Sequence, residues 1–537
     1  MPTNAIHGLE IVFLILLLFV VVFGVLARKL RTPYPIVMVL GGLLLSFIPG
    51  IPRVTLNPDL IFFIILPPLL YSAAWLTSWR EFRYHLVSIC FLAFGLVTFT
   101  VLAVTEAGQW LLPGFDWRVG LVLGAVVAPT DAIAATAIAK RVGLPRRLID
   151  ILEGESLLND ASALLALEFG IGLLVNGRFP TFTGGFLRLG YLIAMGAGIG
   201  LVIGEIVHQI EDRVDDGPIE IALSILTPYV AYLAADYVHA SGVLAVVACG
   251  LYLSRKSSHF FSPSVRLQAW AVWEALTFIL NGLVFVLIGL QLPLVRAEIR
   301  DLGMSTLLFY GLGFSTFLIL LRILWMYPGA YLANVIRRRL LHQAERMPSR
   351  RQIFVAGWTG MRGVISLAAA IALPQMLADG RPFPQRNMII FLAFFVILVT
   401  LVLQGLTLPL LIRVLGLAGT AAPRTEERQA RRIILESALV WLESARKAAP
   451  PDAGGIYKDL EQHYRHRLAS LREGGDAQDG IDAGFYRRFV DLSRQMIEVE
   501  RERAVQLRNE GHISDELLRE IERELDLGEA RLVAKET

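Results

Sequence analysis

The segment EGESLLNDASAL, from Glu153 to Leu164, places charged and polar side chains inside a long apolar run. The surrounding run is long enough for a helix that crosses a bilayer, which needs about 20 mainly apolar residues. On such a helix Ser156 and Asp160 are four residues apart and share a face. Glu155 and Asn159 form the adjacent stripe. All four side chains are oxygen donors of the kind that bind hard monovalent cations, so the segment predicts a cation-binding sector at membrane depth.

A second polar group lies near the middle of the apolar run from about Val119 to Ala139, where Pro129, Thr130 and Asp131 follow one another. Proline lacks the backbone N–H and clashes with the preceding helical turn. We therefore expect the helix to break at Pro129 and to leave carbonyl oxygens without helical partners. Secondary transporters build ion sites near the centre of the membrane from interrupted helices of this kind.

A third polar group, the sequence GMRG that starts at Gly360, lies in the apolar run from about Ile353 to Leu377. We expect Gly360 and Gly363 to open this helix as the proline opens the other, and Arg362 to be a counter-charge for a buried acid. Ionisable groups at membrane depth are costly and therefore mark ion or proton pathways. Arg322 falls close to the end of its own apolar run, and we expect its charged head to reach the membrane interface.

The whole chain has the composition of a membrane protein. Its 537 residues are 55% hydrophobic and 18% charged, whereas about a quarter of the residues of a soluble domain are charged. This composition excludes a soluble enzyme and a disordered protein, and a net charge of +3 is too small to indicate a nucleic acid as partner. Cys90 and Cys249 lie far apart in apolar runs, so they predict buried packing rather than a disulfide or a metal site.

The apolar runs predict an all-α membrane protein with about thirteen spanning helices. The runs begin near Leu9, Tyr34, Pro58, His85, Val119, Ile149, Gly185, Ile219, His239, Gln268, Ser305, Ile353 and Met388. Six-helix units that begin at the first and the eighth helix would insert with opposite polarity, because their offset is odd. The count therefore permits inverted repeats, which are common in transporters.

Basic residues in the loops predict the orientation of these helices. With the N-terminus outside, 19 Lys and Arg residues fall in inner loops and about seven in outer loops. Because basic residues accumulate in cytoplasmic loops, we expect an external N-terminus and a cytoplasmic C-terminus in the cell (inner) membrane. No basic segment precedes the first apolar run, which we expect to remain as a span rather than to be cleaved.

The composition changes sharply near residue 417. After residue 420 the chain holds 24 acidic and 20 basic residues. We therefore expect residues 1–416 to form the transmembrane domain and residues 417–537 to form a cytoplasmic helical domain. In the second domain the apolar spacing predicts an amphipathic helix from Ala430 to Ala449 and a helix that begins at Asp515. The sequence leaves open whether this domain only packs against other surfaces or regulates the protein.

Several stretches resemble motifs of the sodium/proton exchangers of the monovalent cation:proton antiporter-1 family. Three of them are APTDAIAATAI (Ala128 to Ile138), EGESLLNDASAL (Glu153 to Leu164) and GWTGMRGVISLAAAIALP (Gly357 to Pro374). Similar, too, are LPPLL (Leu66 to Leu70), SGVLAVVACGL (Ser241 to Leu251) and the tail from Gly511 to Leu532, which resembles that of the long bacterial branch. The resemblance implies the same helix count, two inverted six-helix repeats with crossed broken helices, and a homodimer in the lipid bilayer.

The resemblance also implies roles for individual residues. Asp160 matches the essential carboxylate that binds the cation and the proton in turn. Asn159 matches the Asn of the Asn-Asp pair in relatives that exchange one cation for one proton. Further cation ligands are matched by Asp131, Ser156 and the backbone carbonyl of Thr130.

Two other implied features concern neighbouring helices. Glu155 and Arg362 match a buried structural ion pair between the helices that contain them. Several relatives carry an acid four residues after the second proline of the LPPLL stretch, where this chain has Ser72. The sequence leaves open what this change does.

Together these features predict a secondary antiporter that exchanges Na⁺, with Li⁺ and K⁺ as further candidates, for H⁺. We expect electroneutral 1:1 exchange that serves pH and sodium homeostasis, with Asp160 and Asp131 as the residues that hold the monovalent metal ion. A carboxylate holds a cation or a proton but not both, so competition at Asp160 would couple the two fluxes. The sequence lacks a nucleotide-binding Gly-rich motif, so we expect an ion gradient as the driving force, no cofactor and no enzymatic reaction. The alternatives are a K⁺/H⁺ antiporter, a cation channel and a pH-sensing membrane protein.

Overall fold

The computed structural model is built from helices and connecting turns throughout the residues that it describes, apart from one isolated bridge between Met376 and Pro382. The described residues are 3–48, 57–112, 114–176, 181–214, 216–260, 263–297, 299, 302–343, 347–377, 380–418, 422–447, 454–469, 483–510, 512 and 515–533.

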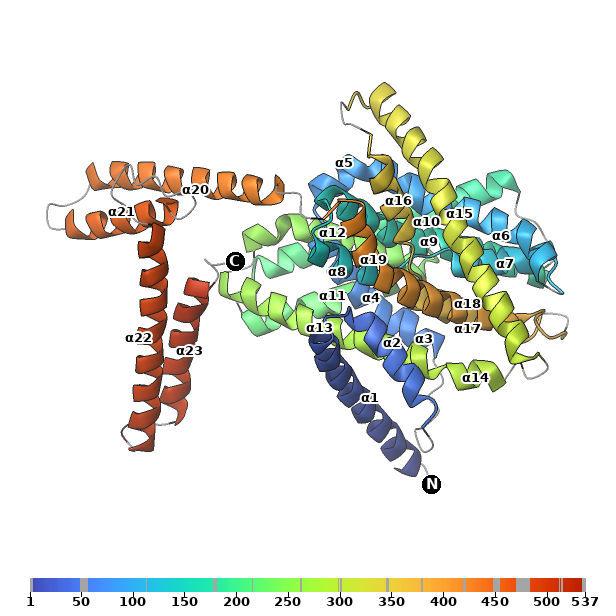
Figure 1. Cartoon of the computed structure of the whole chain (residues 1–537), viewed down its shortest axis with the longest axis horizontal. Coiled ribbons are helices and arrows are strands. Elements are labelled where there is room, and N and C mark those ends of the chain that lie inside the picture. Colours follow the sequence, from blue (N-terminus) through green and yellow to red (C-terminus); the bar gives the residue numbers. More distant parts are fainter. Residues whose placement is uncertain are drawn as a thin grey trace. The chain divides into compact units, whose positions relative to one another are not determined.

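The chain divides into two compact units, Met1–Gly419 and Thr420–Thr537. The change in composition near residue 417 lies within a few residues of this division. Figure 1 shows the helices of the second unit in orange and red.

The first unit contains all the helices up to α19. They are α1 (Thr3–Lys29), α2 (Tyr34–Leu45), α3 (Pro58–Leu60), η1 (Ile61–Ile65), α4 (Leu66–Leu76), α5 (Trp79–Cys90), η2 (Phe91–Leu96), α6 (Val97–Leu111), α7 (Trp117–Val127), α8 (Ala132–Val142), α9 (Arg146–Asn176), α10 (Phe182–Glu211), α11 (Gly217–Tyr237), α12 (Gly242–Phe260), α13 (Pro263–Leu290), α14 (Leu292–Ala297), α15 (Met304–Arg339), α16 (Arg350–Trp358), α17 (Val364–Ile371), α18 (Arg386–Val399), η3 (Thr400–Gln404) and α19 (Gly405–Val414). The η segments are single π-helical turns inside longer helices.

Nine helical segments among the described residues are long and apolar enough to cross a membrane. They are Ile11–Lys29, Pro58–Leu76, Trp79–Leu111, Arg146–Val175, Thr183–Glu211, Gly217–Tyr237, Val265–Ala297, Met304–Arg339 and Arg386–Val414. The shorter helices α2 and α7 are also apolar. The expected all-α, multi-pass membrane fold is thus confirmed, whereas the count of thirteen spans and the inverted repeats stay predictions.

Local sequence signals set the ends of several helices in the first unit. The Asp116 carboxylate caps α7 by accepting a hydrogen bond from the Val119 N–H at 2.9 Å. Ser349 and Gln352 form a reciprocal capping box at the start of α16. Gly143 ends α8 in the left-handed conformation, with φ of 78°, which glycine adopts without steric cost.

The largest buried core of the first unit surrounds the short helices α7 and α17. These helices contact each other, and both contact α18, whose residues from Met388 to Phe394 are buried. Figure 1 shows α17 and α18 side by side. Short helices that are buried on all sides are consistent with elements that lie inside a bundle rather than against lipid.

The second unit contains α20 (Ala422–Lys447), α21 (Gly454–Ala469), α22 (Ala483–Asn509) and α23 (Asp515–Val533). Helix α20 packs against α21, and α22 packs against α23. Helix α20 begins eight residues before the expected Ala430, whereas α23 begins at Asp515 as the sequence predicted. Arg501 of α22 joins the last two helices by hydrogen bonds to Asp526 and Glu529, at 2.9 and 2.8 Å.

Candidate cation site at two interrupted helices

The first interrupted helix consists of α7, residues 128–131, which lie outside a helix, and α8. Pro129 lies in the interruption, where the sequence predicted a break. Asp131 begins α8, because one oxygen of its carboxylate accepts a hydrogen bond from the Ile133 N–H at 2.8 Å. The acid therefore has a local structural role in addition to any role with a cation.

The second interrupted helix consists of α16, the residues 359–363 and α17. Gly360 and Gly363 both lie in or at the end of this interruption, as expected. A Cβ atom on Gly360 would lie 2.2 Å from Cδ of Arg322, and one on Gly363 would lie 2.5 Å from Cβ of Asp131. Both positions therefore require glycine because other chain segments approach them closely.

The two interruptions meet each other. The Asp131 N–H donates a hydrogen bond to the Met361 carbonyl at 2.8 Å. In the opposite direction, Nε of Arg362 donates to the Val127 carbonyl at 2.7 Å. Backbone groups that the breaks release from helical bonding thus pair with groups of the other break, which satisfies buried polar atoms that would otherwise be costly.

One face of α9 lines a cavity of about 370 Å³ beside the first interruption. Its walls include Asp160 and Ser156 of α9 together with Asp131. The cavity reaches Lys140 and Glu153, which form an ion pair of 2.7 Å where α8 ends and α9 begins. Because the Lys140 side chain is exposed, the cavity leads from Asp160 toward one surface of the unit.

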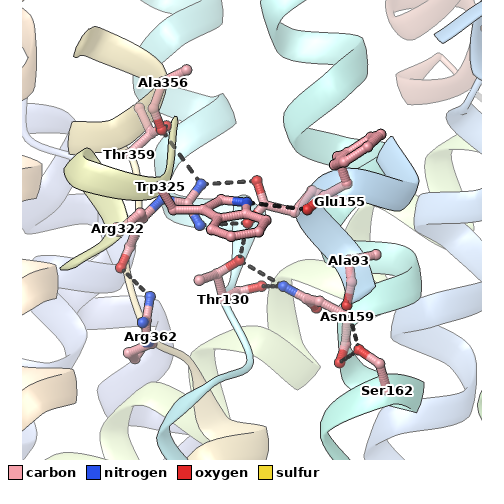
Figure 2. Close-up of polar contacts among 12 residues, drawn as sticks. Ala93, Thr130, Glu155, Asn159, Ser162, Arg322, Trp325, Ala356, Thr359 and Arg362 are labelled. Carbon is pink, nitrogen blue, oxygen red and sulfur yellow. Dashed lines mark hydrogen bonds and ion pairs between the residues drawn. The ribbon is translucent and has the colours of Figure 1, made fainter. Parts of the chain in front are cut away.

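The other stripe of α9 faces a buried hydrogen-bond network, which Figure 2 shows. Nδ2 of Asn159 donates to Oγ1 of Thr130 at 2.6 Å, and at 3.4 Å to the Thr130 carbonyl. Oγ1 of Thr130 in turn donates to a carboxylate oxygen of Glu155 at 2.9 Å. Glu155 and Asn159 are each 1% exposed. This network fixes α9 to the first interruption next to the cavity.

The basic partner of Glu155 is Arg322 of α15. Both Nη atoms of Arg322 bond to the Glu155 carboxylate, and the bond from Nη2 to Oε2 measures 2.8 Å. Two parallel bonds of this kind are the strong, geometrically specific form of an ion pair. The expected pairing of Glu155 with Arg362 is therefore wrong in its basic residue. The expectation that Arg322 reaches the interface is also wrong, because this residue is 2% exposed near the middle of a helix of 36 residues.

Arg362 is buried as well but bonds to backbone groups. Beside its bond to Val127, its Nη1 donates to the Gly360 carbonyl at 2.8 Å, and its N–H donates to Oγ1 of Thr400 at 3.1 Å. The physical reason for the difference from the expected pair is that the interruptions supply free carbonyls beside the guanidinium. These carbonyls accept the hydrogen bonds from the Arg362 guanidinium that we expected Glu155 to accept.

Asp160 differs from the other buried polar groups near the cavity. It is 4% exposed, and within the described part of the chain its carboxylate makes no hydrogen bond or ion pair. The neighbouring Oδ1 of Asn159 is buried and accepts no hydrogen bond there either. An unpartnered buried carboxylate is unstable as an anion without a counter-charge, so Asp160 needs a cation or a proton.

The ligand set around Asp160 contains only oxygen donors. Among the described residues, His, Cys, Asp and Glu form no cluster of three that could hold a metal ion. Two carboxylates, the Ser156 hydroxyl and released carbonyls suit a weakly held monovalent cation rather than a tightly bound structural metal. The cavity wall also includes Asn281 and Ser72, the residue whose effect the sequence left open.

A model of the sodium/hydrogen exchanger transmembrane family matches residues 14–414. An uncharacterized Na⁺/H⁺ exchanger of Mycobacterium tuberculosis is 34% identical over 533 residues, which cover 97% of this chain and 96% of the relative. The uncharacterized Na⁺/H⁺ exchanger YjcE of Escherichia coli is 31% identical, with 98% and 99% covered. A sodium, potassium, lithium and rubidium/H⁺ antiporter of Bacillus subtilis is 34% identical over 75% of this chain and 61% of the relative.

The fold is similar to that of a solved antiporter. The structure of the sodium proton antiporter MjNhaP1 from Methanocaldococcus jannaschii at pH 8 matches with a TM-score of 0.56 and 20% identity, over 76% of this chain and 99% of that one. This likeness concerns the fold. The family match across the membrane unit shows that the chain is a transporter, not an enzyme, and that it belongs to the sodium/hydrogen exchanger family.

Proposed function

We propose that the protein exchanges Na⁺ for H⁺ at Asp160, driven by the gradient of either ion. The observation that carries this proposal is the position of Asp160, a nearly buried carboxylate without a protein partner on the wall of a cavity. Its charge requires compensation, and a proton and a cation compensate it equally well but not together. Binding of one therefore displaces the other, which couples the two fluxes.

The residues around Asp160 have different tasks in this proposal. Ser156 and the free oxygen of Asp131 complete the cation shell from the cavity side, together with the Thr130 carbonyl. Asn159 is fixed by its bond to Thr130, and its amide oxygen accepts no hydrogen bond within the described residues. It adds a neutral oxygen rather than a second exchanging acid.

The stoichiometry follows from that assignment. If Asp160 is the only group that exchanges a proton for a cation, its two loaded forms carry the same charge. Each cycle then moves one Na⁺ against one H⁺ and no net charge. Such an exchanger responds to the two chemical gradients alone, which suits a role in pH and sodium homeostasis.

Orientation in the cell membrane is proposed from the basic loops. With the N-terminus outside, the Lys140–Glu153 end of the cavity would face the cytoplasm, and this proposal makes the described conformation the inward-facing one. Thirteen spans in two inverted repeats, a homodimer in the lipid bilayer and a cytoplasmic second unit belong to the same proposal. Rocking of the interrupted helices against the rest of the unit would expose Asp160 to each side in turn.

A second candidate differs only in the ion. This chain is similar to proteins of Bacillus subtilis and Bacillus pumilus that are named sodium, potassium, lithium and rubidium/H⁺ antiporters. A ligand shell made of oxygen atoms on both a helix and an interruption adapts to ions of different radius more readily than a closed cage. K⁺/H⁺ exchange at the same site is therefore the alternative.

The test uses the purified full-length chain in proteoliposomes with a pH-sensitive dye in the lumen. We expect an outward Na⁺ gradient to acidify the lumen, with Li⁺ and K⁺ tried in the same way. Proton movement with K⁺ but not Na⁺ would select the alternative. Cation conductance without proton movement would indicate a channel, and cation binding without steady flux would indicate a sensor.

A further inference from the structure

Glu274 is an acid on α13 that the proposed exchange cycle does not use. It lies within the membrane-spanning segment Val265–Ala297, and its side chain is exposed. Within the described residues it forms no ion pair. An ionisable side chain at membrane depth is costly and usually faces a wet cavity or a partner, so the position of Glu274 needs an explanation.

The side chain lines a second cavity, of about 320 Å³, between α4, α11 and α13. The walls include Trp270 and Trp273 and, from α11, Ser224. The indole N–H of Trp273 donates to the Ser224 hydroxyl at 3.0 Å, and its ring lies 5.2 Å from the ring of Tyr71. These contacts hold the wall around Glu274 in a fixed position.

The second cavity adjoins the cavity of Asp160. Ser72, Leu76 and Thr277 line both of them. Thr277 follows Glu274 by three residues on α13, which places it on the same side of the helix. Its hydroxyl group is bonded to the carbonyls of Trp273 and Glu274, at 2.7 and 3.1 Å. Glu274 thus lies about one helical turn from Thr277, which lines both its own cavity and the cavity of Asp160.

Four charged side chains line the two cavities apart from Asp131 and Asp160: Lys140, Glu153, Arg266 and Glu274. Lys140 and Glu153 neutralise each other in their ion pair. Arg266, which is exposed and lines the second cavity, adds a positive charge. Glu274 is the acid that offsets it. Without Glu274 these four lining positions would carry one excess positive charge, which repels cations and lowers their local concentration.

We propose that Glu274 is an access carboxylate, which raises the concentration of cations at the mouth of the Asp160 cavity by its charge. The proposal rests on the proposed cation/proton exchange and adds a positioning residue outside the ligand shell. Because Glu274 acts before the cation reaches Asp160, it affects how much cation is needed and leaves the rate at saturation unchanged.

The test compares Glu274→Gln with the unchanged protein in proteoliposomes. The variant removes one negative charge beside the ion pathway, so we expect KM for Na⁺ to rise about three- to tenfold, with the maximal rate within about twofold. The increase should be confined to Na⁺ supplied on the face where the cavity opens. Glu106→Gln is the matched control, because Glu106 is an exposed acid on the span Trp79–Leu111 that lines neither cavity.

A double variant separates charge from structure. Arg266→Gln in the Glu274→Gln protein restores the net charge of the mouth, and we expect KM to return to within about twofold of its original value. An unchanged KM in Glu274→Gln, an equal rise on both faces, or no recovery in the double variant would each overturn the inference. If the unchanged protein itself shows no cation-driven proton movement, the proposed function fails instead.

Discussion

The two polar stripes of α9 are adjacent in sequence but have opposite environments. Glu155 bonds to Thr130 and Arg322, Asn159 bonds to Thr130, and neither of the two is among the residues that line the cavity. Ser156 and Asp160, one residue further along in each case, line the cavity. The difference teaches that a single helix supplies both a fixed polar scaffold and an exchangeable ligand, and that one step of helical rotation separates them.

The two stripes also differ in what a charge costs. The Glu155 carboxylate has a permanent counter-charge in Arg322, so no ion is needed to stabilise it. The Asp160 carboxylate has none within the described residues. A permanent partner makes a group structural, and the lack of one makes it available to cations and protons. The following predictions test this division, from the largest expected effect to the smallest.

The largest effect is expected at Asp160. Asp160→Asn should abolish Na⁺-driven proton movement, because an amide neither releases a proton nor binds Na⁺ as a counter-charge. The fold should persist, since the carboxylate has no protein partner to lose. The measurement is lumenal pH in proteoliposomes, together with the melting temperature of the detergent-solubilised protein.

Glu168→Gln on the same helix is the control for that variant. Glu168 is exposed and pairs with Arg188 at 3.1 Å, away from the cavity lining. Its loss should leave exchange close to the original rate. Robust exchange by Asp160→Asn would remove Asp160 from the centre of the mechanism.

The second prediction concerns the fixed stripe. Arg322→Ala should lower stability by about 3–5 kcal/mol, because it leaves the Glu155 carboxylate buried and unpaired. Adding Glu155→Ala should recover a large part of that loss. The measurement is a double-mutant cycle on unfolding in detergent. The same cycle with Arg362 in place of Arg322 should give a smaller coupling, because Arg362 bonds to backbone carbonyls.

If the two cycles give equal coupling, the division of labour between the two buried arginines is wrong. If the Arg322 and Glu155 variants are simply additive, the ion pair contributes nothing to the folded state. Either result would return Arg362 to consideration as the partner of Glu155.

The sequence predicted the parts of the site that depend on short-range chemistry. Pro129 lacks a backbone N–H and clashes with the preceding helical turn, which favours a break, and glycines next to a buried arginine mark the second break. The neighbourhood of Ser156 and Asp160 follows from helical spacing alone. These features need no knowledge of how distant segments pack, which is why the interruptions and the polar face of α9 lie where they were expected.

The partner of Glu155 could not be predicted in that way. Arg322 is 167 residues further along the chain, and its proximity depends on how α15 packs against α9. Hydropathy placed it near the end of a span because the run was cut at about 20 residues. The helix actually continues to Arg339, which puts Arg322 near its middle. The position of Arg322 far from both ends of one long helix is the signal that would have indicated a buried arginine.

The third prediction concerns the Thr130 hydroxyl, which links Glu155 to Asn159. Thr130→Val keeps the shape of the side chain but removes the donor to Glu155 and the acceptor for Asn159. We expect a loss of about 1–3 kcal/mol in stability, typical of a buried polar group left unsatisfied. Exchange should persist with a higher KM for Na⁺, because Asn159 is no longer held. Thr105→Val on α6 is a control, since its hydroxyl bonds within its own helix and it lines neither cavity.

The smallest expected effect is that of membrane voltage, and it tests whether Asp160 is the only exchanging group. Its proton-loaded and Na⁺-loaded forms have the same charge, and one oxygen of Asp131 is committed to the cap of α8. A single uncompensated charge would couple to voltage by about 2.3 kcal/mol per 100 mV, which shifts the transport equilibrium roughly fiftyfold. We expect no such shift when voltage is clamped with K⁺ and valinomycin at fixed Na⁺ and H⁺ gradients, once K⁺ is excluded as a substrate. A reversal point that moves steadily with voltage would show that a second group takes up a proton in the cycle, and Asp131 is the first candidate. The exchanging carboxylates would then include one outside α9, at the start of α8.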